Sequence, residues 1–121
     1  MTLLSRLQAA TGPDREIDAE IGELVGAADH SGPAYHRPFK DWAKHYTASL
    51  DAALTLVPVG NWWEIGKTTD ERSPMRHFGC SADGIFVAKT HASYGDGGFI
   101  GRHDAPAIAL CIAALKARGI E

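Results

Sequence analysis

The stretch "DAPAIALCIAALKARG", residues 104–119, decides the fold class, because it predicts a long and nearly uniformly apolar helix. Its apolar stripe recurs at i, i+3, i+4 and i+7: Ile108, Cys111, Ile112 and Leu115. Leu110 and several alanines occupy the remaining sides. A helix that is apolar nearly all round is either deeply packed or shared with another subunit. Asp104 is the expected N-cap, with Pro106 in the first turn, and Gly119 is expected to end the helix.

Two further helices are expected before this one. Residues 3–9 carry leucines on one side, and the segment that follows places Ile17, Ile21, Leu24 and Val25 on one stripe among acidic residues. Thr11 is the expected N-cap of this second helix, with Pro13 in its first turn.

The stretch "SLDAALTLVPVGNWW", residues 49–63, predicts a short helix followed by a strand. Ser49 is a suitable N-cap, and Pro58 cannot continue a helix. Trp62 and Trp63 have strand propensity, and on a strand they point to opposite faces. We therefore expect one ring to be buried under a helix and the other to be a candidate contact for a ligand or partner.

Residues 74–94 are expected to form a hairpin that turns at "ADG", residues 82–84. We interpret the next segment, "GDGGFIGRHD", residues 95–104, as a glycine-rich connection. The chain is thus expected to be α+β: a small antiparallel sheet of about three strands, packed by N-terminal helices and a C-terminal helix as an α-β-α sandwich. Its 121 residues fit a single domain, 1–121.

Composition narrows the choice of partners and compartment. The formal net charge is −3, which argues against binding to long nucleic acids but not against a small anion in a local basic pocket. The longest apolar run is too short to span a bilayer, and we see no signal peptide. With two cysteines, Cys80 and Cys111, and no disulfide framework, we expect a cytoplasmic protein with no membrane partner.

Three segments resemble a group of small uncharacterised bacteriophage and prophage proteins. They are "LLSRLQAATGPDREIDAEI", "YTASLDAALTLVP" followed by Trp, and "APAIALCIAALKARG". That group is similar to the phage ABA sandwich domain, in which an antiparallel sheet is held between helices. The resemblance covers well over half of the chain and implies a fold and a phage origin. It brings no catalytic motif, and residues 31–46 and 67–102 depart from the group's pattern.

Motifs that would carry catalysis are missing from the sequence. There is no Cys-x-x-Cys pair, no His-carboxylate set at helical spacing and no G-x-S-x-G elbow. The glycines of residues 95–101 lack the spacing of a P-loop or dinucleotide fingerprint. We therefore expect no metal, no cofactor and no catalytic residues.

The main functional indication is the gathering of basic, aromatic and His residues in two regions. Residues 27–47 are expected to form an irregular loop that includes the first set: Arg37, Lys40, Trp42, Lys44, His45 and Tyr46. The second set lies in the hairpin and the glycine segment: Arg76, His77, Lys89, His91, Tyr94, Arg102 and His103. If the two sets meet, they form a pocket that binds phosphate through cations and bases through aromatic rings. The alternative is that both are ordinary solvated loops.

The residues predicted to bind a ligand are Trp42, Lys44, Tyr46, Trp62, Trp63, Arg76, His77, Lys89, His91, Tyr94, Arg102 and His103. The favoured hypothesis is a non-enzymatic, homo-oligomeric phage protein that sequesters a nucleotide immune signal, of the cyclic oligonucleotide or cyclic ADP-ribose type. One alternative is a protein–protein interaction module, either an inhibitor of a host protein or a minor structural component. The other is a small nucleotide hydrolase that uses histidines as acid–base groups or metal ligands.

Overall fold

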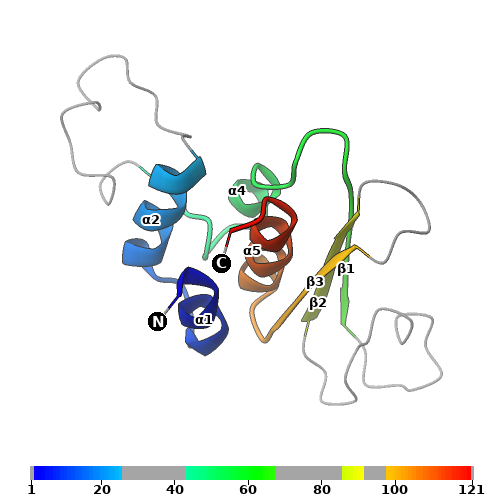
Figure 1. Cartoon of the computed structure of the whole chain (residues 1–121). Coiled ribbons are helices and arrows are strands. Elements are labelled where there is room, and N and C mark those ends of the chain that lie inside the picture. The colour runs from blue at the N-terminus through cyan, green and yellow to red at the C-terminus, as the bar shows by residue number, and fades with distance from the viewer. Residues whose placement is uncertain (1, 26–42, 68–85, 92–97, 121) are drawn as a thin grey trace.

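The computed structural model describes residues 2–25, 43–67, 86–91 and 98–120. Within these ranges the chain forms four helices and three strands (Figure 1). They are α1 (Leu3–Ala9), α2 (Arg15–Val25), α4 (Leu50–Leu54), β1 (Trp62–Lys67), β2 (Phe86–His91), β3 (Phe99–His103) and α5 (Pro106–Ala117).

The strands form one antiparallel sheet in the order β1-β2-β3, with β2 in the centre. Trp62 lies opposite His91 in the first pair, and Val87 lies opposite Arg102 in the second. The expected α+β class, with a three-stranded antiparallel sheet packed by helices, is confirmed. The other arm and the turn of the predicted 74–94 hairpin lie outside the described residues.

The interpretation of residues 95–104 as a connection is wrong for residues 99–103, which form strand β3. The glycine in this strand, Gly101, does not mark a turn. It lies against α5 so closely that a methyl group there would overlap the Ala109 carbonyl oxygen and lie 2.7 Å from Ala113 N. A glycine inside a strand can indicate close approach of another backbone, and that is its role here.

Helix α5 is the central layer of the molecule. It packs on β2 and β3 with one side, while α1 and α4 contact its other sides and α2 contacts α1 (Figure 1). Every residue from Ala107 to Leu115 is buried. Packing within the chain therefore accounts for the apolar character of this helix on all sides, without a second subunit. The described helices lie on one side of the sheet.

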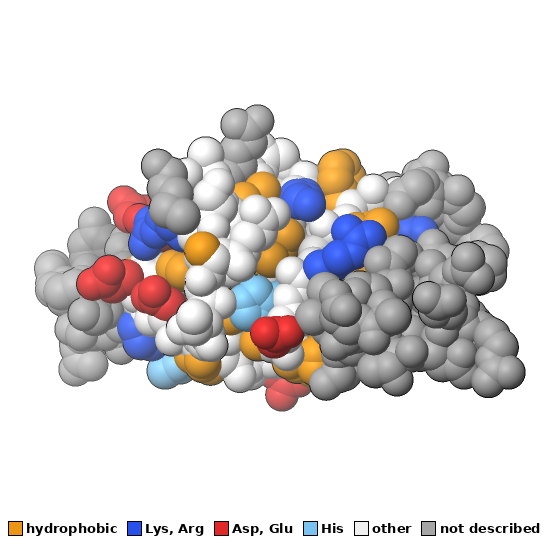
Figure 2. Space-filling model, turned by 90° about the horizontal axis from the view of Figure 1, so that it is seen from below, with side chains coloured by type: hydrophobic (Ala, Val, Ile, Leu, Met, Phe, Trp, Pro, Cys, Tyr) orange, Lys and Arg blue, Asp and Glu red, His pale blue; other side chains and the backbone are white. Residues whose placement is uncertain are grey.

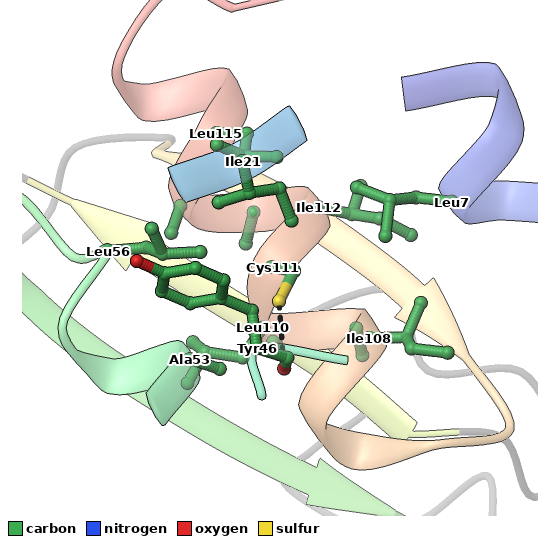
Figure 3. Packing of buried hydrophobic residues seen from close by; sticks show 14 of the residues in the cluster. Leu7, Ile21, Tyr46, Ala53, Leu56, Ile108, Leu110, Cys111, Ile112 and Leu115 are labelled. Atoms are coloured by element: carbon green, nitrogen blue, oxygen red, sulfur yellow. Dashed lines mark hydrogen bonds between the residues drawn. The ribbon is translucent and has the colours of Figure 1, made fainter. Parts of the chain in front are cut away.

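The core lies between α5 and the other helices (Figure 3). Leu7, Ile21 and Leu56 meet the face of α5 that is turned away from the sheet, and the ring of Tyr46 fills the space beside them. The Cys111 thiol donates to the Tyr46 carbonyl oxygen at 3.2 Å. Cys111 is thus a small buried hydrophobe, as expected from its position in the stripe.

Of the three predicted N-cap residues, one is confirmed, and in the other two helices the N-cap position falls later in the chain than predicted. Ser49 caps α4 as expected, accepting from the backbone N–H of Ala52. In α2 the cap is Asp14 and not Thr11, because the Asp14 carboxylate accepts from the N–H groups of Glu16 and Ile17.

In α5 the N-cap position is occupied by Ala105, whose side chain makes no capping hydrogen bond, and Asp104 lies one residue too early. At the other end, Gly119 adopts a positive φ of 77° just after the helix, as expected for a C-terminal glycine. None of the helices in the described ranges is long and apolar enough to cross a membrane.

Candidate functional site

The sheet has two faces of different character. Ala88, Thr90 and Gly101 point toward α5, and the Thr90 hydroxyl donates to the Ala113 carbonyl oxygen at 3.4 Å. Because successive side chains of a strand alternate, their neighbours point the other way. We call that side the outer face. It carries Trp62, Glu64, Gly66, Val87, Lys89, His91, Ile100 and Arg102.

The register places these outer-face side chains in adjacent rows. Trp62 lies beside His91, Glu64 beside Lys89, and Lys89 beside Ile100. Arg102 follows in the next row, beside Val87. Residues directly opposite in an antiparallel pair have Cβ atoms about 5 Å apart. Four of the predicted site residues therefore share one surface: Trp62, Lys89, His91 and Arg102.

The residues of this surface differ in how much of each side chain is exposed to solvent. Trp62 is 60% exposed, and Glu64 and Arg102 are also exposed. Lys89 is half-buried, whereas His91 retains only 6% of its accessible surface. The groups that a ligand could touch are therefore the Trp62 ring, the Glu64 carboxylate, the Arg102 guanidinium and the end of Lys89. His91 and its outer-face neighbour Val87, which is 1% exposed, are too buried for a ligand to touch.

The Glu64 carboxylate does not simply extend outward from β1. Its Oε2 lies 3.6 Å from His91 Nε2, so the side chain leans diagonally toward β2 and toward the row that contains Trp62. Sequence reasoning missed Glu64. The signal was available, since a residue two positions after Trp62 on a strand lies on the same face as Trp62.

Gly98 borders the outer face where β3 begins. It has a positive φ of 65°, and a methyl group there would lie 2.5 Å from the Thr90 carbonyl oxygen and 3.1 Å from Lys89 Cε. The glycine therefore lets the chain pass directly against the end of β2 and against the Lys89 side chain. Gly98, like Gly101, is thus required by close approach to protein backbone.

The prediction that one tryptophan of the pair is buried is wrong, because both are exposed. Trp63 points to the α5 side but is 45% exposed. The physical reason is that α5 packs on β2 and β3, so the start of β1 extends past the helix. Trp63 lies in a row with Thr90 and Phe99, and Phe99 is also exposed. Trp63 is therefore not part of the outer face.

His103 also lies on the α5 side, and the fold uses both of its ring nitrogens. Its Nδ1 accepts from the backbone N–H of Ala105 at 2.9 Å, so Nε2 carries the proton and donates to the Ala10 carbonyl oxygen at 2.6 Å. This ring joins the end of β3 to the start of α5 and to the end of α1. It has a structural role and does not border the outer face.

Lys44 and Tyr46 lie on the opposite side of α5 from the sheet. The Arg15 guanidinium donates to the Lys44 carbonyl oxygen, which places this turn against α2. The predicted meeting of the two basic and aromatic sets therefore does not occur for these residues. Tyr46 is only 1% exposed and belongs to the core, which corrects its assignment as a ligand contact. The other predicted site residues lie outside the described ranges: Trp42, Arg76, His77 and Tyr94.

A buried carboxylate holds this turn in place. Asp18 accepts from the Thr47 backbone N–H at 2.8 Å, from the Thr47 hydroxyl at 2.8 Å and from the Arg15 guanidinium at 3.0 Å. Its charge is thus compensated by three donors, as a buried carboxylate requires. Asp18 has a structural role.

Two groups near this carboxylate have altered acidity. Burial, and to a lesser extent the charge of Asp18, raises the pKa of the Cys111 thiol far above its ordinary value of 9.0. The same two causes raise the pKa of the Tyr46 phenol above its ordinary value of 10.0. A thiol held in its protonated form is a poor nucleophile, so Cys111 is not a candidate for catalysis.

The charges of the described residues are unevenly distributed. In the view from below, acidic side chains are concentrated at the end of the molecule formed by α1 and α2, while Lys and Arg side chains occur at both ends (Figure 2). Within the described ranges, no three His, Cys, Asp or Glu side chains are grouped so that they could hold a metal ion.

Comparison of the chain with models of protein families, with curated proteins and with solved structures finds no match. The phage resemblance therefore stays a prediction, and any proposal about function depends on the residues of the outer face.

Proposed function

We propose that this protein binds a small anionic nucleotide on the outer face of its sheet. The observation that carries the proposal is the placement of an exposed indole, Trp62, on the same surface as Lys89 and Arg102. These are the groups that recognise the two parts of a nucleotide. A base stacks on an aromatic ring, and phosphate oxygens accept hydrogen bonds from ammonium and guanidinium groups.

The spacing of these groups suits a nucleotide. With strands about 4.8 Å apart and a rise of about 3.4 Å per residue, the Cα atoms of Trp62 and Lys89 are separated by about 8 Å. The same diagonal separates Lys89 from Arg102 on the next strand. A base on Trp62 would therefore bring its phosphates within reach of Lys89, and Arg102 would meet a second phosphate.

The biological role that we propose for this binding is sequestration of a nucleotide signal. A phage protein that binds a cyclic oligonucleotide or a cyclic ADP-ribose isomer without altering it would remove an immune signal of the host. The predicted phage resemblance, the absence of a catalytic motif in the sequence and the nucleotide-sized arrangement on the outer face support this form.

The main alternative is a protein–protein interaction module. It is favoured by apolar side chains that remain exposed near the start of β1 and β3: Val59, Trp62, Trp63 and Phe99. Aromatic residues of this kind are typical anchors of protein interfaces. This surface includes Trp63 and Phe99, which point away from the outer face, so variants on the two faces distinguish the functions.

A hydrolase would place its acid–base chemistry on His91 and Glu64. Their 3.6 Å separation is longer than a hydrogen bond, and His91 is buried, so this pair supports the hydrolase less well than simple binding.

The direct experiment is thermal unfolding in the presence of cyclic dinucleotides, cyclic trinucleotides and ADP-ribose derivatives, followed by chromatography of the heated supernatant. A ligand at 100 times its dissociation constant stabilises the fold by about 2.7 kcal/mol, which raises Tm by several degrees. Recovery of the ligand intact is the expected result. Recovery of altered products would show a hydrolase, and no shift with any compound would contradict nucleotide binding and favour the interaction module.

A further inference from the structure

The two edge strands of the sheet differ in how they are protected against pairing with another chain. Among the described residues, β1 and β3 each have a neighbouring strand on one side only. The other side of such a strand carries backbone N–H and C=O groups that can pair again, and proteins often protect it with a lysine. Strand β3 has this protection, because the Lys116 ammonium reaches it from α5 and donates to the Ile100 carbonyl oxygen at 2.9 Å.

Strand β1 begins with two exposed indole rings instead. Trp63 is 45% exposed and lies on the α5 side of the sheet, where α5 packs on β2 and β3 and the start of β1 extends past the helix. Trp62 is 60% exposed on the outer face. An edge strand with exposed apolar side chains is a surface on which another strand can pair.

We propose that two copies of this chain pair through β1, antiparallel and about a two-fold axis, so that their three-stranded sheets join into one continuous sheet. A two-fold interface uses the same surface of both copies, so that surface must be complementary to itself. An axis perpendicular to the sheet keeps the α5 helices of both copies on the same side. Because side chains alternate along a strand, outer-face residues must then lie opposite outer-face residues.

Three registers near the middle of β1 meet this condition, with the axis at Trp63, at Glu64 or at Ile65. The residue on the axis lies directly opposite its own copy. An axis at Glu64 would oppose two carboxylates, which destabilises a strand pair. An axis at Ile65 would leave each Trp63 without an aromatic partner. An axis at Trp63 opposes the two indole rings, and aromatic pairs are among the most favourable cross-strand contacts, so we assign the axis to Trp63.

The residues on either side of Trp63 are compatible with this register. Trp62 would lie opposite Glu64 of the partner subunit, where the indole N–H can donate to the carboxylate. Asn61 would lie opposite Ile65 of the partner subunit. No like charges are opposed at these positions, and the two Trp63 rings would lie between the two α5 helices. The start of β1 is therefore complementary to itself, as a pair of identical copies requires.

This inference goes beyond nucleotide binding and does not rest on it. Each copy keeps its own Trp62, Lys89 and Arg102 on the outer face, whereas the two Trp63 rings meet on the other side of the sheet. Failure to pair would therefore leave the proposed function intact, and failure to bind a nucleotide would leave the pairing intact.

The first test is sedimentation equilibrium of the full chain without nucleotide. Over about 1 μM to about 1 mM, where small interfaces associate, the apparent mass should rise from the chain mass of 13.0 kDa to twice that mass. Trp63→Lys should stay at the chain mass throughout, because it would oppose two ammonium groups on the axis.

The matched control is Phe99→Lys. Phe99 is 46% exposed and shares a row and a side of the sheet with Trp63, but it lies on β3. This variant should associate like the wild type, and circular dichroism verifies that both variants are folded. A wild-type chain that stays at the chain mass, or association that is lost in Phe99→Lys and kept in Trp63→Lys, would overturn the proposal.

The second test determines the register while keeping Trp63, in chains that also carry Cys80→Ser. Asn61→Cys and Ile65→Cys chains, mixed under mild oxidation, should form the mixed disulfide at least tenfold faster than either variant links to itself. Directly opposite residues have Cβ atoms about 5 Å apart, close to disulfide geometry, whereas each of these positions would lie about 14 Å along the strand from its own copy. Rapid linkage of Ile65→Cys to itself would contradict an axis at Trp63.

Discussion

Gly101 of β3 lies directly under Ala109 of α5, so close that no side chain can be placed between the strand and the helix. This contact, together with Ala113 one turn later, sets the distance between the central helix and the sheet. Arg102, the next residue of β3, points to the opposite, outer face.

Replacing Gly101 with Ala should destabilise the fold by about 3 kcal/mol, because the added methyl meets helix backbone that cannot move aside. The matched control is Gly12→Ala. Position 12 has open space around it, so its change should alter the free energy of unfolding by less than about 0.5 kcal/mol. Urea denaturation measures both variants, and equal stability of the two would contradict the assigned packing.

His103→Ala should cost about 2 kcal/mol, because it removes one hydrogen bond to Ala10 and another to Ala105. Asp104→Ala should change stability by less than about 0.5 kcal/mol, since Asp104 is exposed and does not cap α5. Thermal denaturation of the two variants shows which of the two side chains stabilises the start of α5. A larger loss for Asp104 would mean that the aspartate is the cap after all.

Asp18→Ala should destabilise the chain by about 3 kcal/mol or more. The change leaves the buried Thr47 N–H without its acceptor and removes one of the acceptors of the Arg15 guanidinium. Glu23→Ala on the same helix is the control, because Glu23 is exposed and its loss should have little effect. The measurement is again the free energy of unfolding in urea.

Stability should fall in alkaline solution because of Cys111. Burial raises the pKa of its thiol in the folded chain, so above pH 9.0 the unfolded chain loses a proton that the folded chain keeps. The stabilisation is fully present below pH 9.0 and is lost as the pH rises, by about 1.4 kcal/mol per pH unit for one group.

Denaturation curves measured between pH 7 and pH 10 test whether the free energy of unfolding falls as the pH rises. Tyr46 adds a second loss only above pH 10.0, where an unfolded phenol ionises. Cys111→Ala should therefore have a shallower decline between pH 9 and pH 10. A decline of the same steepness in wild type and variant would show that another group is responsible.

The sequence predicted the parts of the fold that depend on local periodicity. The stripe of Ile108, Cys111, Ile112 and Leu115 identified α5, and the leucines and isoleucines of the N-terminal segments identified α1 and α2. Strand β3 was missed because Gly101 is a turn signal in a sequence and a packing requirement in the structure. Only knowledge of the helix above it distinguishes the two meanings.

The candidate site was predicted less completely, for a tertiary reason. Alternation along β1 and β2 could separate Trp62 from Trp63 and could place Lys89 with His91, but it could not show that α5 stops short of β1. Tyr46 and Lys44 were grouped with the sheet by composition alone, whereas the fold places α5 between them and the outer face. His103 was selected for its chemistry, and its two hydrogen bonds serve the fold.

Trp62 and Trp63 offer the most direct test of nucleotide binding on the outer face, because they are adjacent, exposed and on opposite faces of the same strand. Calorimetric titration of Trp62→Ala and Trp63→Ala with the cyclic dinucleotides of guanine and adenine compares them. Loss of one stacked base costs about 1–3 kcal/mol, so Trp62→Ala should weaken binding by about tenfold or more, while Trp63→Ala should bind like the wild type. Equal effects of the two variants, or a loss confined to Trp63→Ala, would contradict nucleotide binding on the outer face.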